Sequence, residues 1–234
     1  IFRKLHMPIP VIAIDGPSAS GKGTIAAIVA QRLGFHYLDS GAIYRVAAYA
    51  AMQCGIGLAD EPALVDLADR LGLRFDGAEV YLDGQPVGDA IRTEEAGRAA
   101  STIAVLPRLR EALLARQRAF RQAPGLAADG RDMGTVVFPD ASVKVFLTAS
   151  AEERANRRYK QLIEKGLNAN LSRILQDLQE RDARDAARTA APMQHAPDAV
   201  LIDTTGMTIA AVVQRVLDLY SQASGNQAPK ASEG

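Results

Sequence analysis

Short apolar runs alternate with longer amphipathic segments along most of the chain. Five runs have the length of buried strands, at 11–15, 36–39, 126–129, 143–148 and 199–203. Segments with helical spacing or composition lie at 24–33, 107–122, 150–165, 171–188 and 208–222. Continuous apolar strands separated by helices are typical of a parallel sheet that is covered on both faces. The pattern therefore predicts an α/β fold with a parallel β-sheet core flanked by helices.

One stretch, residues 66–105, breaks this alternation. Leu73–Phe75 and Glu79–Leu82 look like short strands, and Asp83-Gly84 is a turn signal between apolar positions. We therefore expect a small inserted subdomain here, within a single domain that covers residues 11–225.

The two ends of the chain carry little pattern. Residues 226–234 are small and polar, and we expect a disordered tail there. Residues 1–10 are expected to be an N-terminal extension, partly vector-derived, with Met7 as the natural start.

Composition and charge narrow the class of protein. The chain has 234 residues, of which 48% are hydrophobic, so it can bury a substantial core. Lys+Arg and Asp+Glu both number 27, which favours neither nucleic acid nor an anionic membrane as a partner. No apolar stretch approaches the roughly 18 residues of a membrane span. The single cysteine, Cys54, cannot form an internal disulfide, so we expect a cytoplasmic protein.

A glycine-rich segment joins the first strand to the first helix. Such a loop turns its backbone N–H groups inward, and with the helix N-terminus and one lysine it can hold phosphates. In the strict motif a Ser or Thr follows the lysine directly. Here Gly23 follows Lys22, and the hydroxyl-bearing residue is Thr24, one place later. The alternative is a glycine-rich turn without a ligand, but the strand before and the helix after favour a phosphate loop. Its residues are Gly16, Pro17, Ser18, Ala19, Ser20, Gly21, Lys22, Gly23 and Thr24.

Polar residues follow two further strands. Asp39 and Ser40 precede Arg45, and they can be read as a helix N-cap followed by a solvated arginine, or as part of a site. Asp129-Gly130-Arg131-Asp132 follows the third strand, either as a polar turn or with Arg131 at the edge where parallel sheets bind ligands.

One helix carries a stripe that changes from apolar to charged. A face that begins in the core and continues as charge should meet an enclosed cleft. The alternative is a helix that emerges into solvent and forms i, i+4 ion pairs. The stripe consists of Leu171, Ile174, Leu178, Arg181, Asp185 and Arg188.

A basic cluster precedes this helix. Arg154, Arg157, Arg158 and Lys160 recur at helical spacing before Lys165-Gly166. They form either a solvated face or a mobile basic lid.

These residues suit phosphoryl transfer better than acid–base chemistry. A donor triphosphate and an acceptor phosphate need fixed cations and Mg²⁺, and an ionised acceptor phosphate needs no general base. Thr24 could contact Mg²⁺ directly or through water, and Asp129 through water. His6, His36 and His195 are interpreted as surface or structural residues.

Several motifs, in one order from about Val11 to Ser221, are shared with a known family. They are DGPSASGKGT, LDSGAIYR, LPRLREALL, ADGRDMGTVVFPDA, and ERDARD followed by Arg188. Together they resemble the bacterial cytidylate kinases. The resemblance implies a P-loop nucleoside monophosphate kinase fold with an acceptor-binding insert at about 66–105 and a lid at about 154–170. It implies transfer of the γ-phosphate of ATP to CMP or dCMP with Mg²⁺.

The resemblance also implies roles for single residues. The loop glycines and Lys22 would hold ATP, and the transfer site would contain Lys22, Arg45, Arg131, Arg157 and Arg158. The acceptor would contact Tyr44, Arg45 and Arg131 and, at its ribose, Ser40, Arg181 and Asp185. The cytosine would be recognised by Ser101, Arg110, Asp132 and Arg188. The expected partners are these small molecules alone, and we expect a monomer.

Two alternatives remain at this point. One is a kinase of the same architecture that acts on UMP, AMP or shikimate. The other is a nucleotide-binding switch, although the Asn-Lys-x-Asp guanine-recognition motif is missing from the sequence.

Overall fold

The computed structural model describes residues 8–76, 79–164 and 166–225. The expected disordered tail and most of the expected N-terminal extension lie outside these residues. Among the helices described, none is both long enough and apolar enough to cross a membrane.

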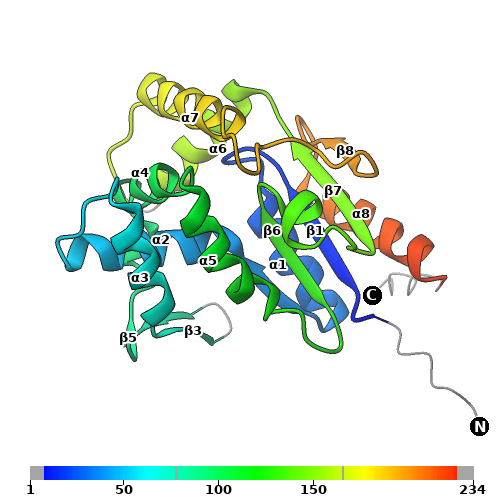
Figure 1. The fold of residues 1–234 in the computed structure, drawn as a ribbon. Coiled ribbons are helices and arrows are strands. Elements are labelled where there is room, and N and C mark those ends of the chain that lie inside the picture. Colours follow the sequence, from blue (N-terminus) through cyan, green and yellow to red (C-terminus); the bar gives the residue numbers. More distant parts are fainter. Residues whose placement is uncertain (1–7, 77–78, 165, 226–234) are drawn as a thin grey trace, which may run out of the picture.

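A five-stranded sheet forms the centre of the molecule (Figure 1). All four neighbouring pairs are parallel, in the order β2-β6-β1-β7-β8, which confirms the predicted parallel core. The most central strand is buried along its whole length, as its continuous apolar sequence predicts. The strands are β1 (Val11–Asp15), β2 (His36–Asp39), β6 (Leu126–Gly130), β7 (Val143–Thr148) and β8 (Val200–Asp203).

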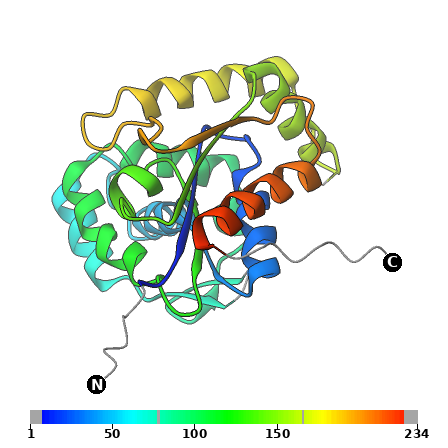
Figure 2. The same ribbon diagram turned by 90° about the vertical axis from the view of Figure 1, so that its right-hand side faces the viewer.

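Helices cover both faces of this sheet. Alternate side chains of β1 point to opposite faces, and because they are apolar on both, each face packs against helices. Ile12 and Ile14 pack in one cluster with α1 (Lys22–Leu33) and α8 (Ile209–Ser224). Figure 2 shows these two helices on the same side of the sheet.

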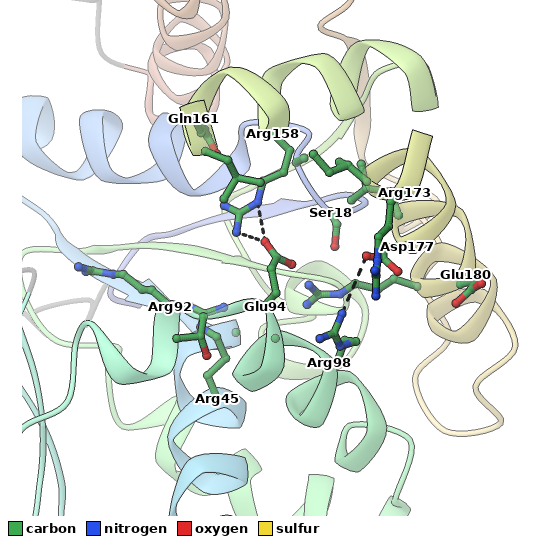
Figure 3. A pocket seen from close by; sticks show the side chains of 18 of the residues that line it. Ser18, Arg45, Arg92, Glu94, Arg98, Arg158, Gln161, Arg173, Asp177 and Glu180 are labelled. Atoms are coloured by element: carbon green, nitrogen blue, oxygen red, sulfur yellow. Dashed lines mark hydrogen bonds and ion pairs between the residues drawn. The ribbon is translucent and has the colours of Figure 1, made fainter. Parts of the chain in front are cut away.

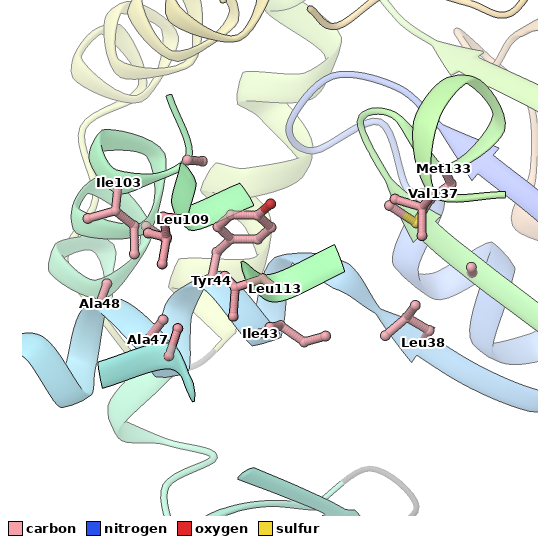
Figure 4. Close-up of a cluster of buried hydrophobic side chains, with 14 of the residues drawn as sticks. Leu38, Ile43, Tyr44, Ala47, Ala48, Ile103, Leu109, Leu113, Met133 and Val137 are labelled. Carbon is pink, nitrogen blue, oxygen red and sulfur yellow. The ribbon is translucent and has the colours of Figure 1, made fainter. Parts of the chain in front are cut away.

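The opposite face of the sheet packs on a second set of helices. Val11 and Ala13 contribute to a cluster with residues of α2 (Ser40–Gln53) and α5 (Pro107–Arg118). Figure 4 shows part of this cluster, with Leu38, Ile43 and Leu113 close together.

The segment expected to be an insert contains a small separate sheet. Its antiparallel strands are β3 (Leu73–Asp76), β4 (Glu79–Leu82) and β5 (Gln85–Pro86). The helix α3 (Glu61–Arg70) precedes the sheet, and a 3₁₀ turn, η1 (Ala90–Arg92), and α4 (Glu94–Ile103) follow it. A cluster of buried apolar side chains from β4, η1 and α2 joins this sheet to α2.

Two helices lie over the edge of the main sheet at which its strands end (Figures 1 and 2). They are α6 (Ala151–Glu164) and α7 (Leu171–Ala186). The side chain of Asn170 accepts a hydrogen bond from the Arg173 N–H and so caps the start of α7. The residues expected to form the lid therefore comprise most of α6 and the turn that leads to α7.

Candidate active site

The glycine-rich segment forms a loop between β1 and α1. Gly16 has φ 150°, and a Cβ there would lie 2.1 Å from the carbonyl oxygen of Leu147. Gly21 caps α1 at φ 90°. Both positions therefore require glycine. The loop ends at the N-terminus of α1, whose first residue is Lys22, so the helix N-terminus and the lysine can bind the same anion.

Lys22 is buried at the start of α1. Its Nζ donates a hydrogen bond to the Pro17 carbonyl at 3.1 Å, which folds the side chain back over the loop. Burial and the nearby Arg131 guanidinium lower the pKa of Lys22 well below its ordinary range. A lysine in this environment gains more from an anion than a solvated lysine does.

Two carboxylates lie near Lys22 at the ends of neighbouring strands. The Tyr37 hydroxyl donates to Asp129 Oδ1 at 2.7 Å, and a Cβ on Gly23 would lie 3.6 Å from the same oxygen. Burial and the charge of Asp39 raise the pKa of Asp129. The residue after Lys22 therefore faces Asp129, whereas Thr24 is exposed on the first turn of α1.

These two acidic residues fit a magnesium ion. Mg²⁺ usually takes one or two carboxylates together with substrate phosphates and water. Asp129 and Asp39 both line the cavity that contains Lys22, and Asp39 also caps α2 and pairs with Arg45 at 2.6 Å. Burial and the charge of Asp39 disfavour ionised Asp129, so a cation between the two carboxylates would stabilise its ionised form. Thr24 is not among the residues that line this cavity.

A cavity of about 750 Å³ opens beside the loop. We call it the phosphate cavity. Figure 3 shows its wall, where Arg45 comes from α2 and Arg158 from α6. Lys22, Arg131 and Arg181 also line it. These five cations come from α1, α2, α6, α7 and the turn after β6, and they are among nine described Lys and Arg residues that line the cavity, although the chain as a whole has no net charge.

A second cavity, of about 50 Å³, adjoins the first and is called the acceptor pocket. Arg131 and Arg181 line both cavities. The pocket brings together nine of the ten residues expected at the acceptor, and the tenth, Arg45, lines the phosphate cavity. The nine are Ser40, Tyr44, Ser101, Arg110, Arg131, Asp132, Arg181, Asp185 and Arg188.

Asp185 organises the arginines of this pocket. Its carboxylate accepts a hydrogen bond from Arg131 Nε at 2.8 Å and another from Arg188. Burial alone would raise the pKa of Asp185, but the guanidiniums of Arg131 and Arg188 outweigh burial and hold the pKa below its ordinary value. Arg131 also donates to the Ser18 hydroxyl at 2.8 Å, so Asp185 connects α7 to the phosphate loop.

A second buried pair occupies the far side of the pocket. Arg110 on α5 donates to Asp132, which follows β6, and both side chains are at most 10% exposed. The hydroxyl of Ser101, on α4, is buried and has no hydrogen-bond partner among the described residues. Carboxylate, hydroxyl and guanidinium groups thus lie where the resemblance places the base.

The two lid arginines have different surroundings. Arg158 lines the phosphate cavity and pairs with Glu94 at the start of α4 (Figure 3). Arg157 lines neither cavity and instead donates to the carbonyl and hydroxyl of Thr204 and to the Ser20 carbonyl. Arg157 therefore braces the phosphate loop from behind.

Sequence reasoning missed other residues that shape the site. Asp15, the last residue of β1, accepts hydrogen bonds from the N–H groups of Met133 and Gly134, each at 2.8 Å. It therefore fixes the turn that carries Arg131 and Asp132. Burial raises the pKa of Asp15 to about 7. The available signal was a carboxylate at the end of an apolar strand.

Comparisons with known proteins agree with this geometry. A family model described as cytidylate kinase matches residues 12–222. The cytidylate kinase of Bordetella bronchiseptica is 60% identical over 211 residues, which are 90% of this chain and 95% of that protein. The cytidylate kinase of Chromobacterium violaceum is 58% identical over 222 residues, which are 94% of this chain and all of that protein. Among solved structures, a gluconokinase from Sinorhizobium meliloti 1021 aligns with 93% of this chain and 94% of its own, at 18% identity and a TM-score of 0.47.

Proposed function

We propose that this chain, which belongs to the cytidylate kinase family, transfers the γ-phosphate of ATP to CMP or dCMP and releases ADP. The observation that carries the proposal is the pair of adjoining cavities. One is lined by residues of the phosphate loop, the other by carboxylate, hydroxyl and guanidinium groups that could recognise a base, and Arg131 and Arg181 line both.

The shared arginines indicate where transfer would occur. Burial and repulsion from Arg131 lower the pKa of Arg181, and the Arg181 Nε has no hydrogen-bond partner among the described residues. Crowded cations of this kind are stabilised by anions, and a transferring phosphoryl group spreads negative charge over its oxygens. Arg45, Arg131 and Arg181 are therefore placed to stabilise that charge between donor and acceptor.

The protein's contribution would be positioning and charge. The loop and Lys22 hold the donor phosphates, while the acceptor pocket aligns the attacking phosphate oxygen, which is already ionised and needs no base. Mg²⁺, held near Asp129 and Asp39, would supply additional positive charge at the donor phosphates. Arg158 would reach the donor once it leaves Glu94.

The acceptor pocket also supports recognition of cytosine. Asp132 and Ser101 can accept from the 4-amino group, and Arg110 and Arg188 can donate to the N3 acceptor beside it. Uracil would meet an acceptor against an acceptor and a donor against a donor. This complementarity favours CMP over the alternative UMP.

The direct test is an ADP-release assay with ATP and every ribo- and deoxyribonucleoside monophosphate, with shikimate included. We expect CMP and dCMP to be the preferred acceptors. Preference for any other acceptor would contradict the proposal.

A further inference from the structure

A buried hydrogen bond lies behind the acceptor pocket, between two helices that are distant in sequence. Ser40 is the first residue of α2, and its hydroxyl lines the pocket. Gln117, on α5, is 2% exposed and does not itself line the pocket. The Ser40 Oγ donates to Gln117 Oε1 at 2.7 Å.

The direction of this hydrogen bond follows from a second contact of the glutamine. The Gln117 Nε2 lies 3.5 Å from the backbone carbonyl of Leu113, one turn earlier in α5. A carbonyl can only accept, so the amide NH₂ must face Leu113 and the amide oxygen must face Ser40. Gln117 can therefore only accept from Ser40.

This arrangement decides what Ser40 can offer to a ligand. A serine hydroxyl has one proton and two lone pairs, and Gln117 takes the proton. The oxygen that faces the pocket therefore presents lone pairs alone. It will accept a hydrogen bond from a ligand hydroxyl and cannot donate one.

Ser40 shares the pocket with several arginines and with the carboxylate of Asp185. The guanidiniums of Arg131, Arg181 and Arg188 only donate. The carboxylate of Asp185 accepts from Arg131 on one oxygen and from Arg188 on the other, and each oxygen keeps a further lone pair. A ligand hydroxyl near these arginines can therefore direct its proton to Ser40 or to Asp185.

We propose that Gln117 is a positioning residue that holds Ser40 as an obligatory hydrogen-bond acceptor, and that it thereby selects an acceptor nucleotide with a hydroxyl at one position of its sugar. The inference rests on the proposed function, because it takes a nucleoside monophosphate as the ligand. It assigns a role in sugar recognition to a residue that touches no substrate.

The test compares Gln117→Met with wild type on CMP, 2′-deoxy-CMP and 3′-deoxy-CMP. Methionine keeps the length of the side chain but accepts no proton from Ser40, which is then free to rotate. We expect kcat/KM to fall between roughly threefold and tenfold for CMP and for one deoxy analogue, as the loss of one hydrogen bond implies. The analogue that lacks the recognised hydroxyl should change less than twofold, and the KM for ATP should stay the same.

Three further variants separate orientation from general damage. Gln122→Met, on an exposed position of the same sequence region, is the matched control and should change nothing. Gln117→Glu should keep the selectivity, because a carboxyl group still accepts from Ser40. Adding Gln117→Met to Ser40→Ala should cause no further loss, since both changes remove the same interaction.

Each outcome has a separate meaning. Equal losses on all three nucleotides, or no loss with Gln117→Met, would overturn the role of Gln117. If Gln117→Met does not fold, a Gln117→Glu variant that folds but loses the selectivity would overturn it as well. Failure of the wild-type protein to phosphorylate CMP would instead overturn the proposed function.

Discussion

Lys22 shows how burial prepares a single side chain for its ligand. Its charge is removed from water and lies among both arginines and carboxylates, and its Nζ donates to one carbonyl oxygen. Such a lysine contributes little to folding, but it can stabilise an anion strongly because the surrounding dielectric is low.

We therefore expect Lys22→Ala to lower kcat by roughly a hundredfold or more, as the loss of other fixed donors does, with little change in thermal stability. Steady-state kinetics and a melting curve would measure the two effects. Lys160→Ala, on the exposed side of α6, is the matched control. Near wild-type turnover in the Lys22 variant would show that this lysine takes no part in the mechanism.

The lowered pKa of Lys22 also predicts proton uptake when ATP binds. Bound phosphates favour the charged lysine and raise its pKa towards the ordinary value of about 10.4. At pH 8 the free protein should therefore carry less than a full proton on Lys22 and gain the remainder on binding, whereas an ordinary lysine would gain none. Titration calorimetry of ATP without Mg²⁺, in two buffers of different ionisation enthalpy, measures this uptake. Lys22→Ala should remove it, and uptake that persists in this variant would assign the proton to another group.

Asp132 is the residue on which the choice of base should depend. Asp132→Asn keeps the side-chain volume but adds an amide that can donate to the uracil carbonyl. We expect the ratio of kcat/KM for CMP over UMP to fall at least tenfold, because mismatched buried polar groups can discriminate by about 10⁴. Asp198→Asn, at an exposed aspartate, is the control. Equal losses on both nucleotides would mean that Asp132 serves another purpose.

At the scale of elements, the sequence predicted the sheet better than the helices around the site. The five strands were recognised as short apolar runs, whereas their order in the sheet was not predicted. The three-stranded sheet of the insert was only partly predicted, since β5 has two residues and no apolar pattern of its own.

The charged stripe of α7 was predictable because it continues an apolar face. Leu178 is buried, and Asp185, two turns later, reaches the acceptor pocket. Gln117 gave no such signal, since a glutamine on a polar helix looks solvated until α2 is packed against it. Burial there depends on tertiary structure that sequence spacing does not encode.

The sequence did not distinguish the environments of Arg157 and Arg158, which are neighbours on α6. Successive residues of a helix point about 100° apart, so one sequence motif placed two arginines in different environments. The exposed pair of Arg158 with Glu94 should contribute no more than about 1 kcal/mol. Arg157 instead satisfies backbone carbonyls beside the phosphate loop.

We expect Arg158→Ala to lower kcat about tenfold or more with an unchanged melting temperature. Arg157→Ala should mainly lower stability, by about 1–3 kcal/mol, or roughly 2–12 °C in Tm for a domain of this size. Kinetics and thermal melts of both variants test this division. An Arg157 variant with normal stability and low turnover would indicate that Arg157 acts at the transfer site itself.

At the scale of the whole molecule, the phosphate cavity lies between three parts: the sheet edge, the insert and the α6–α7 pair. Few strong interactions hold the insert to the lid. Glu94 pairs with Arg158, and Arg98 with Asp177 at 4.0 Å, and all four side chains are partly exposed (Figure 3). Exposed pairs of this kind cost little to break. The insert and the α6–α7 pair can therefore move relative to each other without loss of the core.

We expect α4 and α6 to move towards the sheet when donor and acceptor are both bound, because water in the cavity would weaken each charge interaction and hydrolyse ATP. Hydrogen exchange with a bisubstrate analogue should slow in 94–103 and in 154–164. The amides of α8, which packs on the sheet away from both cavities, are the internal control and should keep their rates. Each substrate alone should slow exchange less than the analogue does, because it recruits only one set of arginines. If the analogue bound tightly and left exchange in both segments unchanged, the cavity would already have its catalytic shape, and Arg158 would have to reach the donor by a side-chain rotation alone.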